Sequence, residues 1–291
     1  MKGIPKIFLA IILFFSFGNA GFASELQVHF INVGQGDSIL IVAPNGKKIL
    51  VDAGFHSGAG DEKNPFNYLK GLKQKGKIAD LQIDLAVITH AHDDHYGGFK
   101  YLCDKDPEDH DFYVANLLYS VEDPKAYGKF ANCLHSLALQ AQTYGQISVR
   151  GPPLEIGDGV ELIVLHPFDR VEKPSRDKND DSIILQLKYG GSSFLLTGDA
   201  SAVVEKELLN EDIESNVLKL GHHGARTSSA ENFLKKVSGG KRGFYAVISS
   251  DDEDGKGKTY GHPHLETLER LKEIPGIHLY RTDLHGNTVF T

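Results

Sequence analysis

Two stretches of this 291-residue chain repeat the same order of features. The first, "DSILIVAPNGKKILVDAG", begins at Asp37, and the second, "DSIILQLKYGGSSFLLTGDA", begins at Asp181. Each predicts two apolar strands around a Gly-containing tight turn, with an aspartate, Asp52 or Asp199, near its end. Each is followed by an expected helix, an apolar strand and a His-rich loop. We interpret this order as an internal duplication of a strand–strand–helix–strand unit.

Such a duplicated unit predicts two mixed sheets packed face to face, with helices on the outside. The fold class is therefore α+β (α/β), a four-layer αββα sandwich, in which the His-rich loops meet at one edge. Within it we expect a helix at 65–75, a buried strand at 81–89, a strand at 112–119 and a helix at 127–144. Residues 280–286 are expected to form a closing hairpin.

The first 23 residues, "MKGIPKIFLAIILFFSFGNAGFA", are predicted to be a signal peptide, which leaves 24–291 as a single domain. Two lysines precede an apolar run at 7–17, and small residues follow, with cleavage expected after Ala20 or Ala23. An uncleaved anchor is the alternative, but the run is short for a membrane span of about 20 residues. The prediction is export to a periplasmic or extracellular location, with no stable membrane span after cleavage.

Charge and cysteine content limit the function further. Removing two of the 31 basic residues leaves 29 against 39 acidic residues, a net charge near −10. The chain therefore lacks the basic footprint of most nucleic-acid binders, although metal ions would supply local positive charge in a nuclease. Only Cys103 and Cys133 are present, compatible with one disulfide in an exported protein or with two free thiols.

The loop after the expected strand at 81–89 reads "THAHDDHYGG" and concentrates four metal-ligand types. His90 and His92 are two apart on an extended segment and project to one side, whereas Asp94 and His95 follow where the chain turns into a helix. We therefore assign the first pair to one metal and the second pair to a neighbouring one. Two ions a few Å apart need a bridging anion. Asp199 is the candidate bridge, and His222 from "GHHG" completes the second site.

Seven motifs together resemble the metallo-β-lactamase superfamily. "HAHDDH" fits its H-x-H-x-D-H signature, and "FINVGQGDSILI", "ILVDAG", "NDDSIILQL", "FLLTGD", "LKLGHHG" and "YGHPH" look like the branch with the extracytoplasmic hydrolase-like domain of the ComEC/Rec2 competence proteins. The resemblance covers about residues 26–291. It implies the metallo-β-lactamase fold and two divalent ions, Zn²⁺ or Mn²⁺. The implied ligands are the six already named: His90, His92, Asp94, His95, Asp199 and His222.

Two further positions follow from the resemblance. Asp52 matches an acid at a strand end that orients the ligands, although a turn-capping role is the alternative. Most members of the superfamily also supply a third histidine to the first site, but "KNDDS" stands at that place here. Asp180, Asp181 and His166 remain alternatives for this third ligand.

An anion site is predicted around the metals. Helices are expected to start near Ser228, with Glu231 three residues on, and at Pro263. Their N-termini suit a phosphate. The residues expected to orient the metal ligands or to bind the substrate are Asp52, His223, Arg226, Thr227 and Ser229. Asp94 and His262 are the expected catalytic residues, with His262 donating a proton to a leaving alkoxide or binding a phosphate oxygen.

The sequence thus predicts an exported metal-dependent hydrolase that uses a metal-bridging hydroxide. The expected substrate is a phosphodiester, with DNA first and a phosphorylated cell-envelope polymer second. Hydrolysis of a lactam or ester is an alternative, as is a non-catalytic accessory role in DNA uptake.

Overall fold

The computed structural model describes residues 25–55, 62–103, 112–141, 143–145, 153–240, 242–251 and 260–291. The predicted signal peptide and its cleavage sites lie outside these residues. Within the described ranges, no helix is both long enough and apolar enough to cross a membrane.

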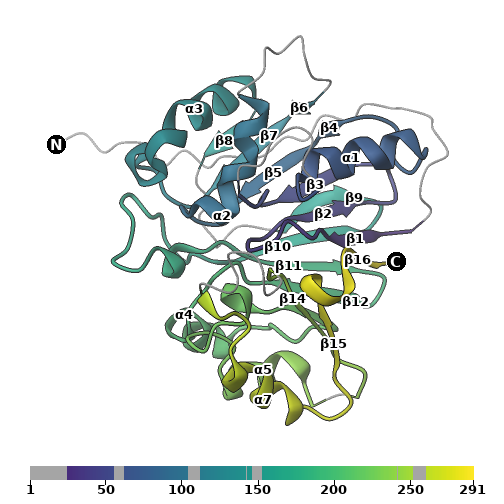
Figure 1. The fold of residues 1–291 in the computed structure, drawn as a ribbon, viewed down its shortest axis with the longest axis vertical. Helices are drawn as coiled ribbons and strands as arrows, with labels where there is room; N and C mark the ends of the chain where they lie inside the picture. The colour runs from purple at the N-terminus through teal and green to yellow at the C-terminus, as the bar shows by residue number, and fades with distance from the viewer. Residues whose placement is uncertain are drawn as a thin grey trace.

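Two seven-stranded mixed sheets form the centre of the molecule (Figure 1). The first has the order β16-β1-β2-β3-β5-β7-β8 and the second the order β15-β14-β13-β12-β11-β10-β9, while β4 and β6 form a separate parallel pair. The strands of the first sheet are β1 (Gln27–Phe30), β2 (Ile39–Val42), β3 (Lys48–Val51), β5 (Leu85–Ile88), β7 (Asn116–Tyr119), β8 (Thr143–Gly145) and β16 (Thr288–Phe290). Those of the second are β9 (Leu154–Gly157), β10 (Val160–His166), β11 (Ile184–Tyr189), β12 (Ser192–Leu196), β13 (Val217–Lys219), β14 (Tyr245–Ile248) and β15 (His278–Arg281), and the pair is β4 (Gln82–Ile83) and β6 (Tyr113–Val114).

Helices cover the outer face of each sheet (Figure 1). The α-helices are α1 (Pro65–Gln74), α2 (Asp93–Tyr96), α3 (Ala131–Gln140), α4 (Ala202–Glu207), α5 (Glu231–Ser238), α7 (Leu265–Lys272) and α8 (Thr282–His285). The 3-10 turns are η1 (Gly97–Leu102), η3 (Pro124–Phe130), η4 (Lys178–Asp181), η5 (Leu208–Asn210) and η6 (Gly221–Gly224). In Figure 1, α1 and α3 lie above the sheets and α4, α5 and α7 below them, which gives the predicted αββα order.

Alternation along the strands explains these layers. In β3, Ile49 and Val51 face the second sheet, whereas Leu50 faces the helices of the first half. In β12, Leu196 joins the core between the sheets, whereas Leu195 packs with α4 and α5. Because both faces of each sheet are covered, the strands are apolar almost throughout.

The two sheets repeat one topology, which confirms the predicted duplication. In the first, β1, β2 and β3 pair antiparallel, and β3 then pairs parallel with β5. In the second, β10, β11 and β12 pair antiparallel, and β12 then pairs parallel with β13. The carboxyl ends of β5 and β13 therefore present their following loops at corresponding places in the two halves.

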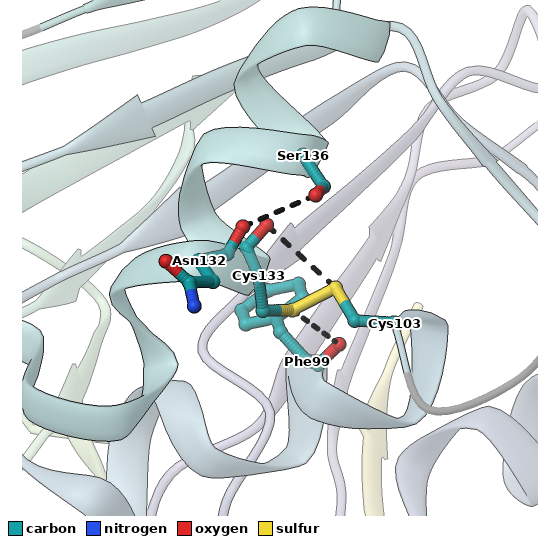
Figure 2. The surroundings of a disulfide bond; sticks show 5 residues. All are labelled: Phe99, Cys103, Asn132, Cys133 and Ser136. Atoms are coloured by element: carbon teal, nitrogen blue, oxygen red, sulfur yellow. Dashed lines mark hydrogen bonds between the residues drawn. A yellow bond between two sulfur atoms is a disulfide. The ribbon is translucent and has the colours of Figure 1, made fainter.

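A disulfide joins Cys103 and Cys133, so the first of the two sequence-based alternatives is correct. Figure 2 shows the bond between the end of η1 and the first turns of α3, with the Cys133 sulfur 3.8 Å from the carbonyl oxygen of Phe99. Because η1 continues directly from α2, the disulfide ties the helix of the "HAHDDH" motif to the outer helical layer.

The expected helix at 65–75 is present as α1, whose N-cap Asn64 accepts a hydrogen bond from the Phe66 amide. Elsewhere the structure corrects four expectations. The predicted strand at 81–89 is divided between β4 and β5, which belong to different sheets. The predicted strand at 112–119 is divided between β6 and β7, which belong to different sheets. The predicted helix at 127–144 is confined to α3, because Gly128 at φ 54° interrupts η3 before it and β8 follows it.

The predicted closing hairpin at 280–286 is wrong. β15 pairs with β14 in the second sheet, whereas β16 pairs with β1 in the first. The short helix α8 carries the chain between the two sheets and ends at Gly286, whose φ is 67°. The C-terminal strand therefore links the halves instead of folding back on its neighbour.

Candidate metal centre

Loops from both halves converge at one edge of the sandwich. His90 and His92 leave the carboxyl end of β5, and Asp94 and His95 lie on α2 directly after them. Asp199 follows β12, and the "GHHG" turn η6 follows β13. The predicted meeting of the His-rich loops is therefore present in the structure.

Ligand atoms gather in two clusters that share Asp199. The first consists of His90, His92 and Asp199, and the second of Asp94, His95, Asp199 and His223. Within each cluster the ligand atoms lie within 4.8 Å of one another. A mixed imidazole and carboxylate set of this kind suits a borderline divalent ion such as zinc.

The two oxygens of Asp199 face both clusters. Its Oδ2 lies 3.9 Å from Nε2 of His90 and 3.4 Å from Nε2 of His223, and its Oδ1 lies 3.2 Å from Nε2 of His95. Although buried, Asp199 Oδ1 and His95 Nε2 form no hydrogen bond of suitable geometry with any described residue. Unsatisfied polar atoms are costly in a protein interior. Metal coordination would satisfy both atoms, so the residues fit a bound ion.

His223, rather than His222, occupies the fourth place of the second cluster. Its Nε2 lies 3.2 Å from Oδ2 of Asp94, while its Nδ1 donates to the Ser249 carbonyl at 3.0 Å. The sequence predicts His222 at this place, but the ring of His222 lies at the mouth of the site. Nε2 of His222 is 3.8 Å from Asp199, and 26% of its side chain is exposed. The difference arises because both histidines have positive φ, 49° and 54°, which reorients successive side chains relative to an ordinary strand or helix.

Asp52 lies behind His95, where the resemblance expected an orienting acid. It is fully buried and accepts hydrogen bonds from the Thr89 amide at 2.8 Å and the Thr89 hydroxyl at 2.7 Å. Its Oδ2 also accepts a hydrogen bond from Nδ1 of His95 at 2.7 Å. This last contact fixes the His95 tautomer so that the Nε2 lone pair points into the cluster.

A buried ion pair, not anticipated from the sequence, supports His223. Nζ of Lys219 lies 2.7 Å from Oδ2 of Asp37 and donates to the Leu220 carbonyl at 2.8 Å. The other Asp37 oxygen is 3.5 Å from Nδ1 of His223. A lysine inside the apolar strand "VLKL" was the available signal, because a fully buried lysine requires a buried anionic partner.

The histidines of the two clusters differ in the direction of their pKa shifts. Burial lowers the pKa of His90 and His92, so both imidazoles are neutral and free to act as ligands. Burial alone would also lower the pKa of His95 and His223. The buried acids around them, Asp199 with Asp52 beside His95 and Asp199 with Asp37 and Asp94 beside His223, together outweigh burial and hold both pKa values well above the ordinary value. In the metal-free protein the second cluster therefore carries protons, which an incoming cation must displace.

The three alternatives for an extra ligand of the first cluster all have other partners. Asp180 accepts a hydrogen bond from the Ser201 hydroxyl at 2.5 Å, and Asp181 accepts one from the Ser175 amide at 2.9 Å. His166 donates to the Ser182 carbonyl at 2.7 Å. Among the described residues, none of the three joins a ligand cluster. The first cluster instead borders a cleft of about 610 Å³, lined by His92, Arg176, Asp177, Lys178 and Asp180.

The predicted substrate residues lie at different depths. His262 is close to the site, since its ring centroid is 5.2 Å from that of His222 and its Nδ1 accepts from the Gln35 amide at 3.2 Å. Burial and the neighbouring histidines lower the pKa of His262 to about 3. Thr227 lies beside His222, with its hydroxyl 3.5 Å from Nδ1. Arg226 lies outside the cluster, paired with Glu266 at 3.3 Å.

Ser229 lies inside the protein rather than on the surface of the site, so the structure does not support its expected role in substrate binding. It is fully buried at φ 57°, and both its amide and that of Ala230 donate to the carboxylate of Glu205, at 2.5 and 2.8 Å. The predicted capping box at Ser228 is absent, because the Ser228 side chain has another partner and the helix begins later than expected. The Ser228 hydroxyl donates to the Ala200 carbonyl, and α5 begins only at Glu231.

Sequence comparisons connect the chain with competence proteins. The profile of the Metallo-beta-lactamase superfamily matches residues 31–241. ComE operon protein 3 of Bacillus subtilis is 30% identical over 94% of this chain and 34% of its own length. Competence protein ComA of Neisseria gonorrhoeae is 30% identical over 92% of this chain and 32% of its own length. The chain thus spans about one third of the length of the curated relatives it matches.

Solved structures agree on the fold. The metallo-beta-lactamase fold protein YhfI of Bacillus subtilis gives a TM-score of 0.55 at 12% identity, covering 91% of this chain and 99% of YhfI. A metallo hydrolase from the archaeon Ignicoccus hospitalis gives a TM-score of 0.51 at 14% identity, with the same two coverages. At such identities the likeness concerns the fold alone.

Proposed function

Because the chain belongs to the metallo-beta-lactamase superfamily, we propose that it is an exported metal-dependent phosphodiesterase that cleaves DNA. The family supports a metal-dependent hydrolase related to competence proteins. The observation that carries the proposal is the sharing of Asp199 by two adjacent ligand clusters. Paired metal sites of this kind suit the displacement reactions of phosphodiesterases and nucleases.

We assign two divalent ions, zinc or manganese, to the two clusters. His90, His92 and Asp199 would hold the first, and Asp94, His95, Asp199 and His223 the second. When bound, the ions would activate a water molecule and stabilise the negative charge that develops on the phosphate. The protein contributes by holding its ligands in fixed orientations, through Asp52 behind His95 and through Ser249 behind His223.

His262 suits phosphate binding better than proton donation. With a pKa of about 3, its imidazole is neutral at pH 7 and has no acidic proton ready for a leaving group. The Gln35 amide donates to its Nδ1, which places the proton of the neutral ring on Nε2. We therefore assign His262 a hydrogen bond to a non-bridging phosphate oxygen.

One observation supports DNA as the substrate, and two support export as the location. The curated relatives named above are competence proteins, among them "Competence protein ComA". The Cys103–Cys133 disulfide suits an oxidising compartment outside the cytoplasm. The N-terminal apolar segment is the proposed export signal.

The test measures cleavage by protein loaded with Zn²⁺ or Mn²⁺. The substrates are bis-p-nitrophenyl phosphate, single-stranded DNA, double-stranded DNA, a poly(glycerol phosphate) polymer and a chromogenic cephalosporin. We expect cleavage of the small diester and of DNA, lost in Asp94→Ala and His223→Ala. His135→Ala, at an exposed position of α3, is the matched control and should retain full activity.

Three outcomes would contradict the proposal. Turnover of the cephalosporin without diester cleavage would indicate a lactamase. Cleavage of the glycerol phosphate polymer but not of DNA would indicate an envelope enzyme. Binding of DNA by the metal-loaded protein, with no turnover of any substrate, would indicate an accessory protein.

A further inference from the structure

The cleft beside the first cluster is lined by a cationic side chain, that of Arg176, which does not belong to the metal centre. His92 forms one wall, and the segment between β10 and β11 supplies the other lining residues, Arg176, Asp177, Lys178 and Asp180. We propose that Arg176 binds a second phosphate of the substrate strand, one that neighbours the phosphate at the metals. This inference rests on the proposed phosphodiesterase function. It assigns to Arg176 the preference of the enzyme for a polymeric substrate over a small diester.

The segment around Arg176 is fixed to the metal loop. Nζ of Lys178 donates to the carbonyl of Ala91 at 3.0 Å and to that of Ala126 at 2.9 Å. Ala91 lies between His90 and His92, so the lysine joins the two walls of the cleft through the backbone of the motif. On the other side of Arg176, the Ser175 amide donates to Asp181 at 2.9 Å. The backbone on both sides of the arginine is thus held in place.

The other charged groups of the lining already have partners. The Asp177 carboxylate accepts from the Asn179 amide at 3.1 Å, and Asp180 accepts from the Ser201 hydroxyl. Lys178 is engaged by its two carbonyls, and His92 belongs to the first cluster. Arg176 is exposed and has neither an ion pair nor a hydrogen bond to any residue in the described ranges.

An unpaired guanidinium beside a hydrolytic centre suits a phosphate. Two other arginines differ from Arg176 in having acidic partners: Arg226 pairs with Glu266 and Arg170 with Glu122. Arginine binds phosphate through two parallel N–H donors. The cleft of about 610 Å³ is much larger than one phosphate group and is open to solvent over much of its extent. A small diester therefore reaches the metals without filling the cleft, whereas a strand continues into it.

The test compares Arg176→Gln with Arg242→Gln, which neutralises an arginine before the amino end of β14, the end opposite the metal loops. The substrates are bis-p-nitrophenyl phosphate and a short single-stranded oligothymidylate. For Arg176→Gln we expect a KM for the oligonucleotide raised about tenfold and a salt dependence of kcat/KM reduced by about one unit of slope. The small diester should be cleaved at the wild-type rate, and Arg176→Lys should recover part of the affinity.

The inference fails if both Gln variants lower oligonucleotide cleavage equally, or if Arg176→Gln slows both substrates alike. An effect of Arg176→Gln on a poly(glycerol phosphate) polymer but not on the oligonucleotide would overturn its assignment to DNA. If the wild type cleaves neither substrate, the proposed function fails by itself. Oligonucleotide binding by fluorescence anisotropy then decides the role of Arg176, since equal affinity in the two Gln variants would still refute it.

Discussion

The two halves of the molecule supply their metal-site residues in different ways. In the first half, His90, His92, Asp94 and His95 come from one short segment that passes from extended chain into α2. In the second half, Asp199 and the "GHHG" turn come from two separate loops, after β12 and after β13. The first half therefore encodes its ligands in local periodicity, whereas the second half depends on how two loops are folded against each other.

In the second half positive φ falls on the histidine turn itself, whereas in the first half it falls on Asp52 (φ 58°), behind the ligands. His222, His223 and Ser229 all have positive φ, a conformation that costs on the order of 1–3 kcal/mol for a residue other than glycine. The surrounding contacts hold this conformation, notably the Ser249 carbonyl on His223 and Glu205 on the Ser229 amide. Ligand geometry in this half is thus imposed by tertiary structure.

The largest expected effect follows from removing the residue that joins the halves. Asp199→Asn should lower metal affinity at both clusters, because its two oxygens face His90 on one side and His95 on the other. The loss should exceed the roughly 100-fold that removal of an outer contact costs. Metal content after gel filtration measures it, with exposed Asp212→Asn as the matched control. Loss of metal from one cluster alone would contradict a shared acid.

The second prediction concerns close packing in the first half. A Cβ on Gly98 would lie 1.9 Å from the Ala53 carbonyl oxygen, so Gly98→Ala must push α2 and η1 away from β3. We expect a loss of about 3 kcal/mol in unfolding free energy, the upper end of the usual cost of overpacking. Gly71→Ala in α1 meets nothing within 4 Å and should instead stabilise by about 0.5–1 kcal/mol. Urea denaturation of the two variants gives the comparison, and equal stabilities would contradict it.

The third prediction isolates the outer support of the first half. In Asp52→Asn, a side-chain amide N–H faces Nδ1 of His95 where a carboxylate oxygen accepted its proton. The variant therefore favours the His95 tautomer whose proton is on Nε2, the atom that faces the cluster. Metal affinity of the second cluster should fall about 10- to 100-fold. The unfolding temperature of the metal-free protein should also fall, because the buried Thr89 and His95 groups lose an anionic acceptor. Isothermal titration with Zn²⁺ measures the affinity. Asp158→Asn, in the turn between β9 and β10, is the control, and an equal loss there would contradict the specific role.

The fourth prediction concerns the pH dependence of stability, whose slope per pH unit is smaller than the effects above. Burial lowers the pKa of His29 on β1 to about 4, so unfolding free energy should fall as pH drops from 6.5 towards 4, where only the unfolded chain takes up the proton. Burial raises the pKa of Glu205 on α4 to about 7, so unfolding free energy should fall as pH rises from 4.5 to 7. Each slope is at most about 1.4 kcal/mol per pH unit.

Urea denaturation of the metal-free protein across pH 4.5–8 checks both signs. His29→Gln should reduce the loss on the acidic side, where His90, His92 and His262 contribute with the same sign. Glu205→Gln should reduce the loss towards neutral pH, where His95 and His223 contribute with the same sign. His135→Gln, at an exposed position, should leave both slopes unchanged. If a variant retained the wild-type slope, the substituted residue would not be a source of that pH dependence.

The sequence was sufficient wherever the physics is local or repeated. Alternating apolar strands predicted two packed sheets, the repeated hairpins predicted the duplication, and Asn64-Pro65 marked the start of α1. The segment at 280–286 was misassigned as a hairpin because its two strands join different sheets, which only their partners β14 and β1 determine.

In the metal site too, locally determined features were predicted correctly and those that depend on distant contacts were not. Extended spacing brought His90 and His92 to one cluster, and the turn into α2 brought Asp94 and His95 to the other. The choice between His222 and His223 depended on two positive φ angles, and the burial of Ser229 depended on Glu205, a residue 24 positions away. Neither the backbone angles nor the distant contact leaves a periodic trace in the sequence.

Metal content of His222→Ala and His223→Ala tests the central claim most directly. Both variants are loaded with Zn²⁺, passed through gel filtration and compared with the wild type by mass spectrometry of the metal. We expect two ions per chain in the wild type and in His222→Ala, and only one in His223→Ala, because among the described residues His223, and not His222, joins Asp94, His95 and Asp199. Loss of an ion from His222→Ala, with His223→Ala unchanged, would contradict this account.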